Sequence, residues 1–402
     1  MNFSFSNRAP KILMGVMALG AVATVVGIMG DHTDHHQRTW ASLLVNGFFF
    51  LGITLGALFF YSLQNATETA WSVLVKRVFE GIMGFLPIGA IAMIVVLAAG
   101  TFGLHHIYHW MDARLYDPND IEHYDALIAN KQAFLGKGFF WARTLVYLAV
   151  FWFFATWFRK QSLAMDQMTG DSLVTRHLLV YRRSALFLVF FAVFSSTLAW
   201  DWLMSIDAHW FSTLYGWYVF SGMWVSAMIT AVIMVLYLKR KGYLPQVNNS
   251  HIHDMGKWVF AVSFLWSYLY FSQFMLIWYS NIPEEVTYFQ SRINEHPALL
   301  WGTFFINFAI PMVLLMSRDA KRNPRFLIGV GSVIFIGHWL DVNMMVMPGA
   351  LGHHFHGIGL LEVGMFVTFL GLFIYTVLST LTKAPLTPVN HPYLEESVHH
   401  QI

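Results

Sequence analysis

The sequence contains no cysteine and few charged residues. Without cysteine the chain cannot form a disulfide bond, ligate an iron–sulfur cluster through thiolates or attach haem at a Cys-x-x-Cys-His motif. Asp, Glu, Lys and Arg make up only 11% of the 402 residues, whereas a soluble domain carries about 25%. These absences exclude a soluble enzyme and any redox centre that depends on cysteine.

Hydrophobic residues take the place of the missing charges and make up 57% of the sequence. Ten runs reach the length of roughly 20 mostly apolar residues that a membrane-spanning helix needs. We therefore predict an all-α polytopic membrane protein, with one transmembrane domain over residues 1–383 and a cytoplasmic tail over 384–402. The predicted spans are 11–30, 40–63, 83–105, 138–158, 184–204, 214–238, 258–280, 299–317, 326–346 and 358–380.

The positive charges predict the orientation of these spans. Eighteen of the 24 Lys and Arg residues lie in the amino terminus, the even-numbered loops and the tail, and five lie in the odd-numbered loops. By the positive-inside rule, both termini are cytoplasmic. The first apolar run continues to Gly30, past a normal signal-peptide cleavage point, so we predict an uncleaved first span. The net charge of only +2 argues against a nucleic-acid partner.

Several ionisable residues lie within or beside the predicted outer ends of the spans. Ionisable groups inside a membrane are costly and often mark proton relays or ligand pathways. We interpret the group as candidate proton-transfer or ligand-contacting residues, and His338 and Asp341, three residues apart, share a helix face. Two alternatives stay open: Asp201 lies among lipid headgroups, or the outer loops are acidic only because positive charges are sorted inward. The group comprises Arg143, Asp201, His338, Asp341, Glu362, Asp207, His209, His105 and His106.

The histidines do not predict a metal or haem site. His353, His354 and His356 carry imidazoles, which suit zinc and copper, but they lie in a short loop without a thiolate. A haem held by two histidines needs opposed residues on two spans, and His338 is the only histidine well inside a predicted span. We therefore predict solvated histidines, some of which titrate near physiological pH, and no resident metal.

Two long motifs stand out from the rest of the sequence. The first is WDWLMSID at 200–207, followed by HWF at 209–211 and YGW at 215–217. The second is YFSQFMLIWYSNIPEE at 270–285. Both resemble the ActF family of membrane subunits of bacterial alternative complex III, within the NrfD/polysulfide-reductase-C-like membrane proteins. The chain length and the ten-span layout also match, so the resemblance covers essentially the whole chain.

The resemblance implies a fold and a place in respiratory electron transport. The family fold consists of two four-helix bundles, spans 2–5 and 6–9, flanked by spans 1 and 10. Alternative complex III is a quinol:electron-acceptor oxidoreductase of the bacterial cytoplasmic membrane. It feeds cytochrome c or an associated terminal oxidase. The implied partners are lipids, a related NrfD-like membrane subunit, and iron–sulfur and haem c subunits that hold the redox centres. The implied ligand is quinol or menaquinol, which His338 or Asp201 could contact as a general base.

Two other functions fit the sequence. The chain could be a purely structural subunit of the same complex, whose polar groups bind neighbouring subunits. It could instead be a proton-coupled transporter, although such proteins place their ionisable sites near the membrane midplane, and the charges here are predicted near the outer face. Gene neighbourhood discriminates between these classes, because iron–sulfur and multihaem genes would accompany a subunit of the complex.

Overall fold

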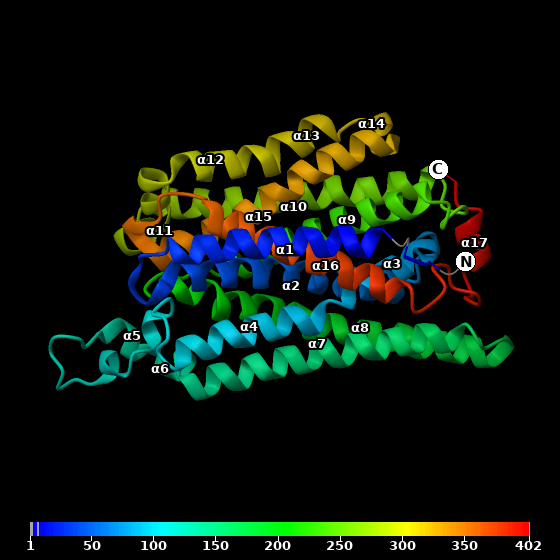
Figure 1. The fold of residues 1–402 in the computed structure, drawn as a ribbon. Coiled ribbons are helices and arrows are strands. Elements are labelled where there is room, and N and C mark those ends of the chain that lie inside the picture. The colour runs from blue at the N-terminus through cyan, green and yellow to red at the C-terminus, as the bar shows by residue number, and fades with distance from the viewer. Residues whose placement is uncertain (1–2, 6–7, 402) are drawn as a thin grey trace.

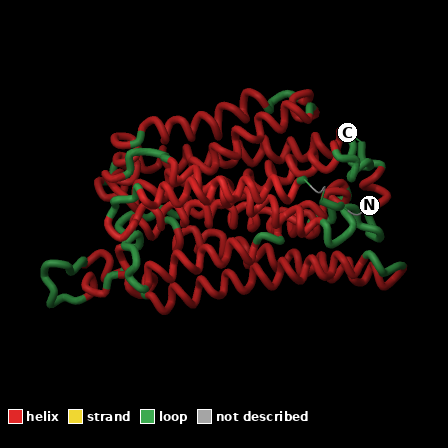
Figure 2. Tube along the Cα trace, viewed as in Figure 1, coloured by secondary structure: helices red, strands yellow, loops and turns green. Residues whose placement is uncertain are grey.

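The structure, a computed structural model, describes residues 3–5 and 8–401. This part of the chain forms helices joined by loops and contains no β-strand (Figure 2). Ten helical segments in it are long and apolar enough to cross a membrane. The prediction of an all-α polytopic membrane protein is therefore confirmed.

Two of the ten spans are assembled from shorter helices. The spans are α1 (Ala9–Met29), α2 (Gln37–Ala66), α3 (Lys76–Met83) with α4 (Leu86–Thr101), α7 (Lys137–Met165), α8 (Gly170–Trp202), α9 (Leu214–Arg240), α10 (Asn249–Ser280), α12 (Pro297–Phe304) with α13 (Ile310–Leu314), α15 (Pro324–Leu351) and α16 (Leu360–Leu381). The short helices between and after them are α5 (Ala126–Asn130), α6 (Gln132–Leu135), α11 (Pro283–Glu295), α14 (Arg318–Arg322) and α17 (Leu394–Val398).

Single turns complete the helical segments. The 3₁₀ turns are η1 (Asp34–His36), η2 (Trp71–Val75), η3 (His109–Met111), η4 (Ala113–Tyr116), η5 (Met204–Asp207) and η7 (Gly352–His354), and η6 (Phe305–Ala309) is a π turn. Prolines mark both broken spans, as expected for a residue that lacks a backbone N–H. Pro87 lies in the first turn of α4, and Pro311 lies in the first turn of α13, directly after η6.

The spans form two four-helix bundles. In the first, α2, α3 with α4, α7 and α8 pack around one core, and in the second α9, α10, α12 with α13 and α15 do the same. The bundles meet where α2 packs against α9. In the most apolar part of each helix, 89% of the residues of α2 and 83% of those of α9 are buried, against 6% for α1. Thus α2 and α9 form the centre, and α1 lies outside with α16.

Both chain termini lie at one end of the molecule, on the right in Figure 1. The tail packs across that end: Ser397 donates a hydrogen bond to the carbonyl of Trp71 (3.1 Å), and the His400 ring contacts Asp254 (2.6 Å). We call this the terminal end. The long loop after α4, with α5 and α6, projects from the other end, which we call the distal end (Figure 1). The predicted outer loops all lie at the distal end.

Glycines set the distance between α1 and α16. A Cβ atom added at Gly27 would lie 2.6 Å from Cα of Leu361, and one added at Gly364 would lie 2.7 Å from the backbone nitrogen of Thr24. Real side chains do not approach this closely, so the two backbones can touch only because these residues lack a Cβ. Close packing through small residues is a common way to associate helices in a bilayer.

We predict that Gly364→Leu separates α1 from α16. Forced overpacking of a tight contact costs about 1–3 kcal/mol, so the variant should unfold at a lower temperature in detergent than the parent protein. Gly15→Leu is the matched control, because a Cβ at Gly15 meets no atom within 4 Å. Equal thermal stability of the two variants would contradict the close contact.

Candidate functional site

Asp201 forms an ion pair with Arg143 inside the first bundle. The side chain of Asp201 is fully buried near the end of α8. The guanidinium of Arg143, on α7, donates to its two carboxylate oxygens over 2.6 and 2.9 Å, and the hydroxyl of Tyr147 donates over 3.0 Å. Arg143 also lies over the rings of Phe134 and Phe139, 4.0 and 4.2 Å from their centroids. Asp201 is thus shielded from lipid headgroups and neutralised.

Glu362 is neutralised in the same way by a residue of another span. The guanidinium of Arg38, on α2, donates to both carboxylate oxygens of Glu362 over 2.7 and 3.0 Å. The backbone N–H of Gly359 donates to the same carboxylate over 2.7 Å. This bidentate pair fastens the start of α16 to the start of α2, at the distal end.

Asp207 accepts a hydrogen bond from Arg292 of α11 over 2.9 Å. Arg292 is buried, and its guanidinium carbon lies 3.4 Å from the ring centroid of Tyr288. The same guanidinium donates to the carbonyls of Met344 and Met345 over 3.3 and 3.4 Å. One pair therefore joins η5, α11 and the last turns of α15.

The contact with Met344 explains why α15 is longer than predicted. Pro348 lies inside the helix and has no N–H to donate to the carbonyl of Met344, four residues earlier. Arg292 supplies that hydrogen bond instead. The helix continues to Leu351, ten residues beyond Asp341, which corresponds to about 15 Å. The prediction that Asp341 lies near the end of its span is therefore corrected: it lies well inside.

Asp341 differs from the other buried candidates because no arginine contacts it in the described structure. Tyr218 of α9 donates its hydroxyl proton to one carboxylate oxygen, and Nε1 of Trp266 on α10 donates to the other over 3.0 Å. Both donors are neutral, and Asp341 is only 2% exposed. A buried carboxylate that lacks a cation is free to gain or lose a proton without breaking an ion pair.

His338 lies one helical turn from Asp341 and is also buried. Its ring meets the ring of Trp266 edge-on, with centroids 5.5 Å apart. Neither ring nitrogen has a hydrogen-bond partner among the protein atoms described. Because buried polar atoms are nearly always satisfied, these nitrogens indicate a place for water or for a small polar ligand.

A small cavity at the interface of the two bundles includes both residues. It lies between α2, α9 and α15, and Phe48, Gly52, Gly222 and Ser226 contribute to its wall beside His338 and Asp341. The free space in it is close to the minimum that one water molecule requires. The cavity therefore fits a water molecule next to His338 and does not fit a quinone ring.

The remaining histidine candidates lie apart from this cavity, in loops at the distal end. Span three ends at Thr101 rather than at residue 105, so His105 and His106 belong to the loop that follows. His105 is buried, with Nε2 3.0 Å from the carbonyl of Val96. Burial lowers the pKa of His105, partly opposed by that hydrogen bond. The ring of His106 meets that of His35 edge-on.

His209 pairs with a loop carboxylate. Its Nε2 lies 2.5 Å from Asp125 at the start of α5. Burial raises the pKa of Asp125, but hydrogen bonds from the backbone of Ile128 and from His209 outweigh it, so the pKa is lowered overall. Within residues 3–5 and 8–401, no three His, Asp or Glu side chains lie close enough together to hold a metal ion. The nine candidates thus separate into ion pairs, loop contacts and the pair His338 and Asp341.

Reasoning from the sequence missed Tyr218 and Trp266, the two donors to Asp341. The sequence contains 16 Tyr and 16 Trp residues, and nothing in the spacing of these two distinguishes them from residues that only pack. It also missed the roles of Arg38 and Arg292, which read as ordinary loop charges. We refer below to Asp341, His338, Tyr218 and Trp266 as the Asp341 cluster.

We predict that Asp201→Asn destabilises the protein, because it leaves the charge of Arg143 without its partner. Breaking a buried ion pair from one side costs about 3–5 kcal/mol, so thermal unfolding and membrane yield should both fall. Replacing both partners, Asp201→Leu with Arg143→Met, should recover most of the loss.

The matched control for that prediction is Asp112→Asn, which breaks the exposed pair with Arg114. Exposed pairs contribute about 0–1 kcal/mol, so this variant should resemble the parent protein. If Asp201→Asn were equally harmless, the pair would not hold α7 against α8.

Comparisons with known proteins do not identify a family for the chain. No protein-family model matches the sequence, and a search of curated proteins gave no match. The arguments about function therefore rest on the arrangement of the residues and on the resemblance of the two motifs.

Proposed function

We propose that this chain is the membrane subunit of a quinol-oxidising respiratory complex and that its Asp341 cluster transfers protons. The resemblance of the motifs at 200–217 and 270–285 supports the proposal that the chain belongs to such a complex. One observation carries the proton-transfer role: of the four buried or partly buried candidate carboxylates, Asp341 alone has no arginine partner in the described structure. Intramembrane ionisable residues of this kind commonly belong to proton relays.

In this proposal, Asp341 and His338 exchange a proton through water in the shared cavity. Either nitrogen of the His338 ring can accept or donate, since the protein engages neither. Tyr218 and Trp266 hold the carboxylate of Asp341 in one orientation, each donating to one oxygen. Phe48 and Phe49 of α2 also line the cavity, and the side chain of Asp341 is buried, so bulk water does not contact the carboxylate directly.

The cavity is too small for a quinone ring, and we therefore place no quinol step at the Asp341 cluster. In the proposed complex, quinol or menaquinol binds elsewhere and its electrons pass to iron–sulfur and haem c subunits. This chain itself contributes proton-transfer residues and no redox centre. The proposed location is the bacterial cytoplasmic membrane, with the terminal end in the cytoplasm, in agreement with the distribution of positive charges.

A purely structural subunit is the second candidate. Three arginine–carboxylate pairs, Arg143–Asp201, Arg38–Glu362 and Arg292–Asp207, hold the distal end together. A surface held in place by these ion pairs is suited to binding subunits that lie outside the membrane. In that case the Asp341 cluster would serve only to pack α9, α10 and α15, and its loss would affect assembly rather than turnover.

The test uses the whole complex, purified through a tag on this chain from native membranes. We predict that iron–sulfur and haem c proteins co-purify, recognisable by haem absorbance. Asp341→Asn and His338→Ala should each lower quinol-driven proton release by roughly tenfold or more, since a positioned acid or base typically contributes 10²–10⁴-fold. Asp341→Glu, which retains a carboxylate, should recover part of the rate.

Subunit composition is the control in each variant, measured on the same preparations by gel and haem content. Full assembly with unchanged proton release in both variants would refute proton transfer by the Asp341 cluster. Loss of assembly in both would support the structural role. A preparation without any haem protein would overturn the assignment to a quinol-oxidising complex.

A further inference from the structure

A groove on the membrane-facing surface lies where span three is broken. It lies near the terminal end, between the junction of α3 and α4, α7 and the end of α16, and its volume is about 630 Å³ including the part that opens to the outside. Its apolar wall includes Met83, Leu86, Pro87 and Trp152. A groove of this character on the side of a bundle faces lipid, because α7 exposes large hydrophobic side chains such as Trp152 and Phe153.

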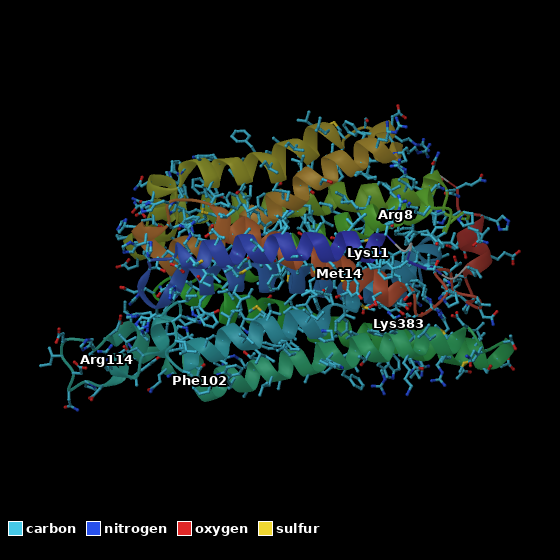
Figure 3. All side chains as sticks on the ribbon, in the orientation of Figure 1. Arg8, Lys11, Met14, Phe102, Arg114 and Lys383 are labelled. Carbon is cyan, nitrogen blue, oxygen red and sulfur yellow. The ribbon has the colours of Figure 1, made fainter. Side chains whose placement is uncertain are left out.

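Two positively charged residues, Arg159 and Lys383, line this groove. Arg159 of α7 donates to the carbonyls of Glu80 and Thr380, over 3.2 and 2.8 Å, which fix its guanidinium without neutralising it. Lys383 follows the end of α16 and is exposed (Figure 3). In the described part of the chain neither cation forms an ion pair.

The one carboxylate that lines the groove is already engaged. The side chain of Glu80 is 2% exposed and pairs with Arg77 over 3.1 Å, and Arg77 in turn pairs with Asp166 over 2.6 Å. The positive charges of Arg159 and Lys383 therefore remain available to an anion from outside the chain. A strongly hydrated free anion gains nothing from the apolar wall. An anionic lipid can contact both regions of the groove, the cations with its headgroup and the apolar wall with an acyl chain.

We infer that this groove binds an anionic phospholipid, with its phosphate on Arg159 and Lys383 and an acyl chain along Trp152 and Leu86. Trp152 precedes Arg159 by seven residues on α7, about 10 Å along the helix axis, which separates the headgroup contact from the acyl contact in the right direction. Basic pockets between membrane helices on the cytoplasmic side are known to bind such headgroups. Arg159 supplies a planar, fixed donor pair suited to a phosphate.

The experiment measures lipid binding to the purified full-length protein in nanodiscs. Phosphatidylglycerol and phosphatidylcholine are the two probes, and retained lipids are counted by native mass spectrometry after release into detergent. We expect preferential retention of phosphatidylglycerol. Lys383→Gln should weaken that binding by about fivefold, the contribution of one cation near a membrane surface. Arg159→Gln should weaken it at least as much.

Lys160→Gln is the matched control, because Lys160 is the next residue of α7, carries the same charge and is exposed, but does not line the groove. It should leave phosphatidylglycerol retention unchanged. Arg159→Gln removes two hydrogen bonds to backbone carbonyls and so could destabilise the protein. In that case the Lys383→Gln variant still tests lipid binding, because the exposed side chain of Lys383 only borders the groove. Equal retention of both lipids, or equal effects of the Lys160 and Lys383 variants, would overturn the site.

Inorganic phosphate distinguishes a lipid from a free anion. Millimolar phosphate should not displace phosphatidylglycerol, because it cannot use the apolar wall. Full displacement would show a free-phosphate site and refute the lipid assignment. Exclusion of phosphatidylglycerol by a co-purified subunit would show that a protein partner occupies the groove instead.

Discussion

The cost of an unpaired charge in the apolar interior governs the arrangement of this bundle. Isolated charges are expensive away from water, and the chain meets that constraint with arginines brought from other elements. Arg143, Arg38 and Arg292 each reach a carboxylate that lies far away in the sequence. Each pair joins two different elements. The contact that neutralises a buried charge therefore also fixes the relative position of those elements. The distal end is therefore both polar and rigid.

Asp341 differs from the other candidate carboxylates in having no arginine partner in the described structure. Asp201, Asp207 and Glu362 each form an ion pair with an arginine, so the exception at Asp341 is informative. The chain supplies Asp341 with two neutral donors, Tyr218 and Trp266, which orient the carboxylate and leave its charge uncompensated. Together with the unengaged ring of His338, this arrangement supports the proposed exchange of a proton at Asp341.

Much of the fold could be predicted from the sequence, because span position depends on local hydropathy. All ten spans were found, and the two spans that are broken into shorter helices are those that contain Pro87 and Pro311. The end of α15 was placed too early because its continuation past Pro348 depends on Arg292, which is more than fifty residues away. A local pattern cannot reveal a hydrogen bond donated by a distant residue.

The same limitation applies to the candidate site. The sequence singles out the ionisable residues near the ends of apolar spans, but hydropathy carries no information about which arginine reaches which carboxylate. It therefore could not separate Asp201, which is neutralised, from Asp341, which is not. The two neutral donors were invisible for a related reason: in a chain so rich in aromatic residues, a Tyr or Trp that orients a carboxylate looks like one that fills the core.

Arg292 engages the polar groups on the distal side of Asp341. Its guanidinium lies against the carbonyls of Met344 and Met345, about one turn beyond Asp341 on α15, and it pairs with Asp207 over 2.9 Å. The two nitrogens of the His338 ring, in contrast, have no hydrogen-bond partner among the described protein atoms, and this ring lines the same cavity as Asp341. In the proposed proton transfer, His338 is therefore the neighbour with which Asp341 exchanges its proton.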